Sequence, residues 1–385
     1  MIIVEIVFWL LLAALLWTAV GYPLLLTILA PFANRRLARS PIEPTVSFII
    51  AAYNEEKDIE RKIRNTLAFD YPKEKLDVIV ASDCSTDRTH EIVEGFQKDG
   101  VRLVILEKRG GKTEAQNAAV RVAKGEILVF TDATTGVAPE SLRGLLESFA
   151  DPRGGCGGAG LEYVSTGNTP VGRGGSAYWQ YEKTVKELEA RVNSLINVSG
   201  CLYAVRASAY APIPADLLSD FVIASDVFAR GFITVYARGE VSQEKTHEDA
   251  SREFEMRARI VTRSIHALFR KVEMLNAFRY GFFSLQLFSH KVLRYMVPEL
   301  LIGLFATGLA LALSGDPNAR LYQVLTAAQV LLYLLAGLGW LCLRFKVKIP
   351  LIHLPFYFVH ANAASLLGLV LYLRGERKVT WTTVR

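Results

Sequence analysis

The carboxylate of greatest chemical interest ends a short apolar run at residues 127–134, Ile-Leu-Val-Phe-Thr-Asp-Ala-Thr. Four apolar residues in a row predict a buried parallel strand, and this strand ends at Asp132. Ligands of open α/β sheets bind outside the carboxyl ends of the strands, where a carboxylate and substrate phosphates can share a hard divalent cation. A single Asp could simply end a strand, but three other predicted strands also end on polar clusters.

These three strands lead into clusters of different composition. Strand 46–52 precedes Tyr53-Asn54-Glu55-Glu56, and strand 76–81 precedes Ser82-Asp83-Cys84-Ser85-Thr86-Asp87. Strand 101–106 precedes Lys108-Arg109-Gly110-Gly111-Lys112, which opens a helix that runs through Asn117. A glycine pair flanked by cations at a helix start favours phosphate binding. Four strands separated by helices predict a mostly parallel α/β sheet with right-handed crossovers and one ligand crevice.

The second half of the soluble region is less regular. It predicts strands at 156–163, 199–205 and 232–237 and a charged helix at 178–191. Asp220 stands at the start of a further helix that ends near Gly231. A basic helix at 253–269 carries Arg257, Arg259 and Arg263, with Arg270 just beyond it.

Composition indicates a membrane protein whose cysteines are reduced. The chain has 385 residues, 51% hydrophobic and 21% charged, which leaves room for two or three domains and favours membrane segments. The net charge of +6 suits anionic lipid and phosphate-bearing substrates, but no run of Lys and Arg indicates a nucleic-acid partner. The four cysteines lack metal or redox spacing and are interpreted as reduced thiols.

Hydropathy divides the chain into five parts. Residues 1–33 are an amino-terminal anchor, because their apolar run is too long for a cleaved signal and the basic residues follow it. Three arginines, Arg35, Arg36 and Arg39, place the next part, 45–270, in the cytoplasm. An amphipathic, aromatic and basic stretch at 276–295 predicts a helix in the membrane interface.

The carboxyl-terminal third, 296–373, predicts about three crossings, followed by a basic tail at 374–385. Three crossings would place that tail outside, against the positive-inside rule. Either the tail is outside, or one segment is re-entrant or interfacial. His353, His360 and Asn362 make the last segment the doubtful one, and we expect its histidines to serve helix packing.

The motifs resemble those of the inverting family-2 glycosyltransferases of GT-A fold, in their membrane-embedded bacterial form. The 52–56 turn and the 82–87 cluster resemble the family's nucleotide-binding turn and its Asp-Asp-Gly-Ser-Thr-Asp motif. Gly110-Gly111-Lys112 with Asn117 resembles the turn beside the diphosphate, and Asp132-Ala133-Thr134 resembles the metal-binding D-x-D. The arrangement is similar to nodulation chitin-oligosaccharide synthases and, more distantly, to hyaluronan and cellulose synthases.

The chain departs from the family pattern at three places. Thr134 replaces the second Asp of D-x-D, which leaves more of the coordination to the diphosphate. Leu218 and Ser219 replace the Thr and Glu of the T-E-D motif, so that Asp220 keeps only its catalytic Asp. Residues 256–260 keep Arg259 of the processive Q-x-x-R-W motif without its Gln and Trp.

The resemblance implies a site built from all these motifs. The residues expected at the nucleotide sugar are Ala52, Tyr53, Glu55, Asp83, Lys112, Asn117, Asp132 and Arg259. Asp132 and Thr134 are expected to hold Mg²⁺ or Mn²⁺ as a Lewis acid at the leaving diphosphate. Asp220 is expected to be the general base, although an Asp in this place could also be a helix N-cap.

The implied activity is inverting transfer from a nucleotide-diphosphate sugar, expected to be a UDP-sugar, with a hexosyl or N-acetylhexosaminyl group moved to a growing exopolysaccharide as a β-linkage. One alternative is transfer of a single sugar to a membrane lipid or lipid-linked acceptor. A third reading is an inactive membrane scaffold. We expect a multi-pass protein of the bacterial inner membrane with a cytoplasmic catalytic domain, in contact with membrane lipids and possible export partners.

Overall fold

The computed structural model describes most of the chain. The described residues are 1–33, 37–164, 170–245, 250–315, 319–345, 347, 349, 351–377, 379 and 380. Side chains are described in these ranges except at 161–164, 170–179 and 238–245. Arg35, Arg36 and part of the predicted basic tail lie outside the described residues.

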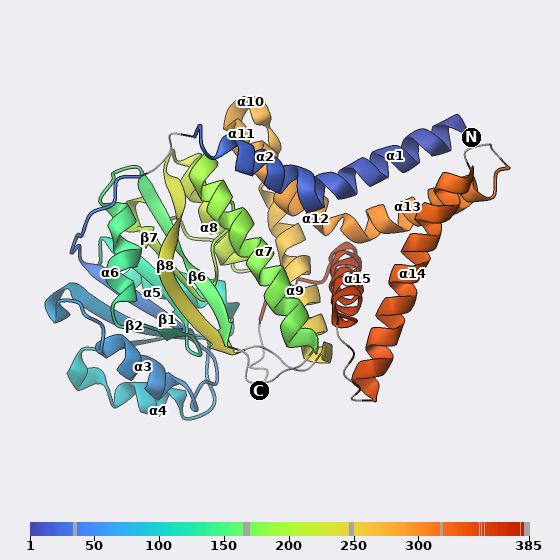
Figure 1. Cartoon of the computed structure of the whole chain (residues 1–385). Coiled ribbons are helices and arrows are strands. Elements are labelled where there is room, and N and C mark those ends of the chain that lie inside the picture. Colours follow the sequence, from blue (N-terminus) through green and yellow to red (C-terminus); the bar gives the residue numbers. More distant parts are fainter. Residues whose placement is uncertain are drawn as a thin grey trace.

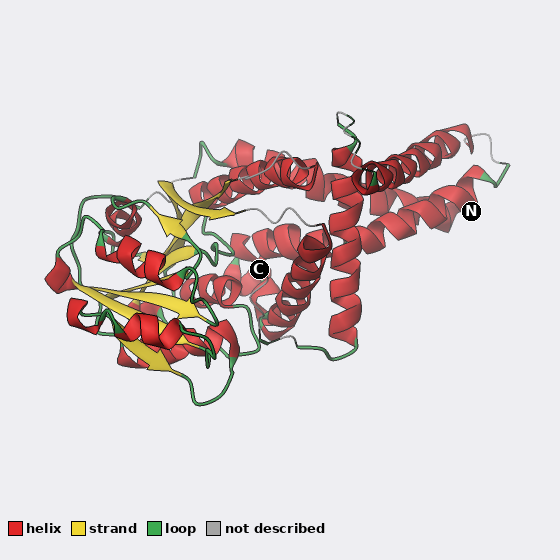
Figure 2. Ribbon diagram, turned by 90° about the horizontal axis from the view of Figure 1, so that it is seen from below, coloured by secondary structure: helices red, strands yellow, loops and turns green. Residues whose placement is uncertain are grey.

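The described strands form one twisted sheet in the order β3-β2-β1-β4-β7-β6-β8-β5 (Figures 1 and 2). The strands are β1 (Val46–Ala52), β2 (Leu76–Ser82), β3 (Arg102–Ile105), β4 (Ile127–Asp132), β5 (Gly136–Val137), β6 (Gly154–Val164), β7 (Leu202–Arg206) and β8 (Ile233–Lys245). β1 pairs in parallel with both β2 and β4, and β2 pairs in parallel with β3. The predicted parallel α/β half is therefore confirmed, and its strand bounds agree with the prediction to within one residue.

The second half of the sheet is mixed. β7 pairs antiparallel with β4 and with β6, whereas β6 and β8 are parallel. The predicted strands at 156–163, 199–205 and 232–237 correspond to β6, β7 and β8, of which β8 is much longer than predicted. The short strand β5 was not predicted, because two residues carry no periodicity.

Both faces of the sheet are buried, which is why its central strands are continuous apolar runs. On one face Ile49 and Phe130 pack with α5 (Gly111–Val122) and α8 (Ser219–Ala229). On the other face Phe48 and Val129 pack with the helices α3 (Ile59–Leu67) and α6 (Ser141–Leu146). Helix α4 (Thr89–Glu94) contributes Val93 to this second core.

Long helices connect the sheet domain to the apolar segments. α7 (Pro170–Val192) and α9 (Ala250–Arg270) lie between the sheet and the apolar helices (Figure 1). The predicted helices at 178–191 and 253–269 are parts of these two elements.

Three described helices are long and apolar enough to cross a membrane: Ile2–Leu29, Ala319–Arg344 and His353–Leu373. The first consists of α1 (Ile2–Leu16), a π-helical segment η1 (Trp17–Gly21) and α2 (Tyr22–Leu29), and the others are α14 and α15. α13 (Val297–Ala312) is shorter and bends by 62° from the segment 282–295 before it.

The predicted interface helix at 276–295 is not one helix. It consists of α10 (Ala277–Tyr280), α11 (Phe282–Leu287), the π-helical η7 (Phe288–Val292) and α12 (Leu293–Tyr295). Gly281, with a φ of +57°, breaks the helix after α10. A positive φ suits glycine and interrupts a helix, and the apolar pattern alone did not reveal this break.

The chain end returns to the sheet domain. α15 runs alongside α9: Tyr357 lies near Arg257, and Tyr372 stacks on Phe269 with ring centroids 5.3 Å apart. Beyond α15, Arg377 contacts His266 of α9. The N-terminus lies at the far end of α1 (Figure 1), whereas Val379, near the end of the described residues, lies beside Gly111 of the sheet domain.

Candidate active site at the carboxyl edge of the sheet

Three of the predicted site residues meet around one glycine. Lys112, at the start of α5, forms an ion pair with Asp132 at the end of β4. The Lys112 ammonium also donates to the Gly200 carbonyl at 3.0 Å. A Cβ at Gly200 would lie 3.3 Å from Asp220 Oδ2 and 3.4 Å from Lys112 Nζ. The end of the parallel strand β4, the start of α5, the turn before the antiparallel strand β7 and the start of α8 therefore bring these three residues together at one edge of the sheet.

Charges in this cluster influence one another. Burial acts to lower the pKa of Lys112, but the Asp132 carboxylate outweighs it, and the pKa of the Lys112 ammonium is raised. Lys112 is therefore a permanent cation at neutral pH, located between the two carboxylates.

Asp220 is the second residue of α8, but its side chain does not cap the helix. The N-cap position is Leu218, and no side chain caps this helix. Asp220 Oδ1 is buried and has no hydrogen-bond partner among the described residues. The N-cap interpretation of Asp220 is thus not what the structure shows, and one oxygen of the carboxylate is available to accept a proton.

The loop after β4 is held by a buried lysine that the sequence did not single out. Lys62 of α3 is 1% exposed and donates to the Thr135 carbonyl at 2.8 Å. Burial lowers the pKa of Lys62 to about 7, and the nearby Asp132 charge opposes this shift. Thr134 is exposed, and its carbonyl accepts from Arg61 at 3.3 Å.

Two arginines of α9 approach the cluster. Burial lowers the pKa of Arg259, and the charge of Asp132 opposes this effect. Arg263, one turn later, is 7% exposed and donates to the Leu217 carbonyl at 2.8 Å. Burial lowers the pKa of Arg263 to about 10, against the attraction of Asp220 and Asp216. The i, i+4 spacing places both guanidinium groups on one face of α9.

The predicted nucleoside side is formed by the ends of β1 and β2. Asp83 is fully buried; its Oδ1 accepts the N–H groups of Gly110 at 2.7 Å and Gly111 at 3.1 Å. The Arg109 guanidinium stacks on the Tyr53 ring, 3.6 Å from its centroid, and its Nε lies 3.6 Å from Asp83 Oδ2. The sequence did not single out Arg109, which nevertheless lies against both residues expected to seat the nucleoside.

Ala52 and Glu55 line the same turn. The Ala52 carbonyl accepts from the Asp83 N–H at 2.9 Å. Glu55 is 7% exposed, and its N–H donates to Thr89 Oγ1 at 2.9 Å. These bonds join the ends of β1 and β2, so the two predicted nucleoside motifs form one surface.

Asn117 has a different position from the other predicted residues. Its Oδ1 accepts from the Tyr210 hydroxyl at 2.8 Å and from the Ile213 N–H at 3.1 Å, and its Nδ2 donates to the Ile213 carbonyl at 2.7 Å. These contacts support a structural role, in which Asn117 joins α5 to the loop before α8.

The residues present fit a divalent cation that is shared with a diphosphate. No group of three or more His, Cys, Asp or Glu side chains that could hold a metal is found among the described residues. The Asp132 carboxylate is 29% exposed and reachable, and the neighbouring Thr134 is exposed. Oxygen ligands of this kind suit a hard cation that completes its coordination with phosphate and water.

Val379 of the tail contacts the turn at Gly110 and Gly111, which the sequence did not predict. A Cβ on Gly111 would lie 2.5 Å from the Val379 carbonyl oxygen, so only glycine allows this approach. Gly111 also has a φ of +83°, which favours glycine independently. A contact between residues so far apart in the chain cannot be predicted from a local sequence pattern.

Comparison with known proteins identifies relatives of the sheet domain. Residues 47–211 match the family model described as Glycosyl transferase family 2. The chain is 35% identical over 104 residues to the succinoglycan biosynthesis protein ExoO of Rhizobium meliloti, which covers 27% of this chain and 29% of that protein. It is 31% identical over 113 residues to a beta-monoglucosyldiacylglycerol synthase of Synechocystis, covering 28% of this chain and 24% of that protein. The matches thus span less than a third of the length of either relative.

One solved structure resembles nearly the whole chain. It is the mannosyltransferase PcManGT from Pyrobaculum calidifontis in complex with GDP-Man and Mn²⁺. The TM-score is 0.73 at 22% sequence identity, covering 97% of this chain and 99% of that chain. The similarity establishes the fold, including the helices around the sheet domain.

Proposed function

Since residues 47–211 form a glycosyl transferase family 2 domain of GT-A fold, we propose that the chain is an inverting, membrane-associated glycosyltransferase that uses a nucleotide-diphosphate sugar. The observation that carries this proposal is that Lys112 and Asp220 meet at Gly200 while Lys112 also pairs with Asp132. It supplies a cation, a metal-binding carboxylate and a base on one small surface.

The proposed chemistry assigns a task to each group. The acceptor hydroxyl attacks the anomeric carbon, its proton passes to Asp220, and the bond from that carbon to the diphosphate breaks with inversion. Lys112 and Arg259, with Arg263 behind them, offset the negative charge that develops on the diphosphate. A divalent cation held by Asp132, Mg²⁺ or Mn²⁺, would add Lewis-acid stabilisation of the same leaving group.

On the nucleotide side we propose that the base and ribose bind between Tyr53, Glu55 and Asp83, with Ala52 closing the turn. The pair of Tyr53 and Arg109 supports this position because it offers an aromatic face and a cation beside a buried carboxylate. A UDP-sugar remains our expected donor, and the solved relative is described with GDP-Man.

For the acceptor, we propose a saccharide or lipid-linked acceptor at the cytoplasmic face of a bacterial inner membrane. The names of the two relatives include a polysaccharide pathway and a glycolipid synthase, so both acceptor classes occur among similar sequences. The absence of the Gln and Trp of Q-x-x-R-W around Arg259 favours transfer of a single sugar to a lipid.

The experiment that tests the proposal supplies purified membranes with a panel of radiolabelled nucleotide sugars and Mg²⁺ or Mn²⁺. We expect one donor to be consumed and its label to enter a lipid-extractable or polymeric product. Product length on a gel then separates single transfer from polymerisation. No turnover of any donor in folded protein would favour the inactive scaffold instead.

A further inference from the structure

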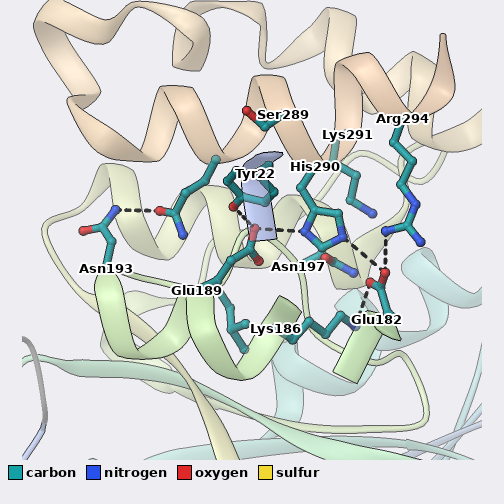
Figure 3. A network of polar contacts seen from close by, with 12 residues as sticks. Tyr22, Glu182, Lys186, Glu189, Asn193, Asn197, Ser289, His290, Lys291 and Arg294 are labelled. Carbon is teal, nitrogen blue, oxygen red and sulfur yellow. Dashed lines mark hydrogen bonds and ion pairs between the residues drawn. The ribbon is translucent and has the colours of Figure 1, made fainter. Parts of the chain in front are cut away.

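A buried polar cluster joins the anchor to α7 and to the segment before α13 (Figure 3). His290 of η7 lies between two carboxylates of α7, with its Nδ1 2.9 Å from Glu189 Oε1 and its Nε2 3.2 Å from Glu182 Oε2. The hydroxyl of Tyr22, from α2, donates to the same Glu189 oxygen, and Arg294 Nη1 donates to Glu182 Oε2 at 2.6 Å. We call these five residues the docking cluster, because three parts of the chain meet there.

The docking cluster is charged as well as buried. Tyr22, Glu189 and His290 are 2%, 0% and 3% exposed. Burial acts to lower the pKa of His290, but the charges of Glu189 and Glu182 outweigh it, and the pKa is raised. Glu189 Oε2 has no hydrogen-bond partner among the described residues, so this carboxylate depends on the two contacts of its Oε1. A buried charge that loses a partner is costly, so the cluster resists separation of the anchor from α7.

Two further hydrogen bonds of the anchor flank the docking cluster. The Trp17 indole donates to Ser289 Oγ at 3.0 Å, and the Tyr181 hydroxyl of α7 donates to the Thr18 carbonyl at 3.1 Å. Trp17 and Ser289 belong to the two π-helical segments of this region, η1 and η7, and such segments are frequent at functional sites.

The end of α7 leads directly to the turn at Gly200, and the interface segment holds the chain in between. Gln286 of α11 is fully buried. Its Oε1 accepts from Asn193 Nδ2 at 2.8 Å, and its Nε2 donates to the Ser194 carbonyl at 3.0 Å. Residues 193–200 therefore begin at a point that is fixed by both α7 and α11.

The same interface segment supports α8, the helix that carries Asp220. Phe283 of α11 is fully buried and stacks on Phe228 of α8, with ring centroids 4.2 Å apart. At the start of α8, the Asp220 carbonyl accepts from the Val198 N–H at 3.1 Å. The proposed base and the turn at Gly200 that faces it are thus both held from the side of the anchor and the interface segment.

We propose that the docking cluster and Gln286 are positioning residues, which fix the turn at Gly200 against Asp220 through the backbone of residues 193–200. This proposal rests on the glycosyltransferase function above. It adds that the anchor, through Tyr22, supports the geometry of the active site as well as tethering the domain to the membrane.

Hydrogen–deuterium exchange of the purified full chain in neutral detergent tests this connection without any substrate. Tyr22→Phe removes only the hydroxyl that donates to Glu189 and keeps the ring. We expect the amides of residues 193–200 and 219–224 to exchange roughly tenfold faster, because a hydrogen bond to a charged group is lost and local opening becomes easier. Gln286→Leu, which removes both bonds to the start of the 193–200 segment, should give the same pattern. The strands β1 and β4 should keep wild-type rates.

Tyr333→Phe is the matched control, because the Tyr333 hydroxyl accepts from Gln329 of its own helix, α14. It should leave exchange at 193–200 and transfer at wild-type levels. Faster exchange over the whole sheet in Tyr22→Phe would indicate a general loss of stability and overturn the positioning role. Unchanged exchange at 193–200 in both Tyr22→Phe and Gln286→Leu would overturn it as well.

Transfer in native membranes, with the donor that the panel of nucleotide sugars selects, tests the catalytic consequence. We expect Tyr22→Phe to lower the transfer rate at saturating donor by roughly tenfold, because small displacements of reacting groups are costly. Nucleotide affinity should stay unchanged, since Tyr22 acts on the turn at Gly200 and not on the nucleotide. An equal fall in affinity and rate would contradict the positioning role.

A double variant tests whether Tyr22 acts through Glu189. Tyr22→Phe combined with Glu189→Met should lose no more transfer than Glu189→Met alone, because both changes remove the same hydrogen bond. Losses that multiply would overturn this route.

The two kinds of measurement separate this proposal from the function on which it rests. A wild type that consumes no donor would contradict the glycosyltransferase proposal, whereas the exchange pattern would still decide the connection from Tyr22 to the turn at Gly200. Normal transfer in both Tyr22→Phe and Gln286→Leu would contradict only the positioning role.

Discussion

Asp220 carries the largest chemical task of any single residue in the proposed mechanism. Asp220→Asn keeps the shape of the side chain but removes the base, and the helix does not depend on it as a cap because Leu218 occupies that position. We expect donor affinity to stay unchanged while transfer falls by roughly 10²- to 10⁴-fold. Parallel measurements of nucleotide affinity and transfer rate check this expectation. If both fall equally, Asp220 is structural and the base must be sought elsewhere.

Substitution of Asp132 tests the requirement for a metal ion separately from the role of Asp220 as the base. Asp132→Ala removes the one carboxylate in contact with Lys112, and we expect it to abolish transfer, as should excess chelator with the wild type. Mg²⁺ or Mn²⁺ should restore the chelated wild type but not the variant, because oxygen ligands dominate the proposed site. Thr134→Ala should have a smaller effect. Full activity of the wild type in excess chelator would exclude a required metal.

At the residue scale the sequence predicted that Lys112, Asp132 and Asp220 would lie close together, and they do. Asp132 ends a parallel strand, which periodicity predicts, whereas Asp220 reaches the same edge at the start of α8, beside the antiparallel strand β7. Arg109 was expected only as a cation beside the glycine pair, not stacked on Tyr53, and Lys62 was not expected, since neither a stacking contact nor a buried lysine has a local signature. Asn117 matched a motif, but its contacts were decided by a loop almost a hundred residues later.

Among the elements, the turn at Gly200 positions the cluster most directly. Gly200→Ala would place a methyl group 3.3 Å from Asp220 Oδ2 and 3.4 Å from Lys112 Nζ, so one of them must shift. We expect transfer to fall roughly tenfold to a hundredfold, because small misplacements of reacting groups are costly. Gly337→Ala in α14 is the control, since its Cβ would meet nothing within 4 Å. Thermal unfolding of both variants should stay close to that of the wild type, and a large loss for Gly200→Ala would indicate misfolding instead.

The loop after β4 depends on Lys62, and this dependence gives a pH signature. Burial lowers the pKa of Lys62 to about 7 in the folded chain, whereas an unfolded lysine titrates near ~10.4. Between these values the unfolded chain holds more protons, so this group makes stability rise with pH from about 7 to about 10. Lys62→Met should flatten the unfolding temperature over this range, and Lys57→Met, which removes an exposed lysine nearby, should not. Unchanged pH dependence in Lys62→Met would show that Lys62 does not titrate in this way.

Helices and strands were predicted correctly where the apolar pattern is strong, and wrongly where the backbone conformation of a single residue ends the element. The strands β1 to β4 and the helices α8 and α9 follow directly from apolar runs and their polar ends. The prediction of a single helix at 276–295 was wrong, because the positive φ of Gly281 breaks the helix after α10. The contact of Val379 with Gly111 depends on how the whole chain packs, which no local pattern contains.

At the scale of the whole molecule, the sequence left open on which side of the membrane the basic tail, 374–385, lies. Although α15 is long and apolar enough to cross, we expect the alternative in which it does not, because α15 runs along α9, and Arg377 and Val379 contact α9 and the turn at Gly111. The start of α1 lies instead beside the end of α13 and the start of α14, where Glu5 accepts from the Tyr322 hydroxyl at 2.5 Å and Phe8 packs on Tyr322. We therefore expect the start of α1 and the segment after α15 to lie on opposite sides of the membrane.

Three reporter fusions test this topology in intact cells. A reporter after Arg39 and one after Arg385 should both score cytoplasmic, because Arg39 and Val379 contact the sheet domain and the donor is made in the cytosol. A reporter after Gly315, between α13 and α14, should score on the other side. This pattern requires α1 with α2, α13 and α14 to be the crossing elements, while α15 lies along the domain at the membrane surface. A tail on the opposite side from Arg39 would show that α15 crosses, and then Arg377 could not reach His266 in the membrane-bound enzyme.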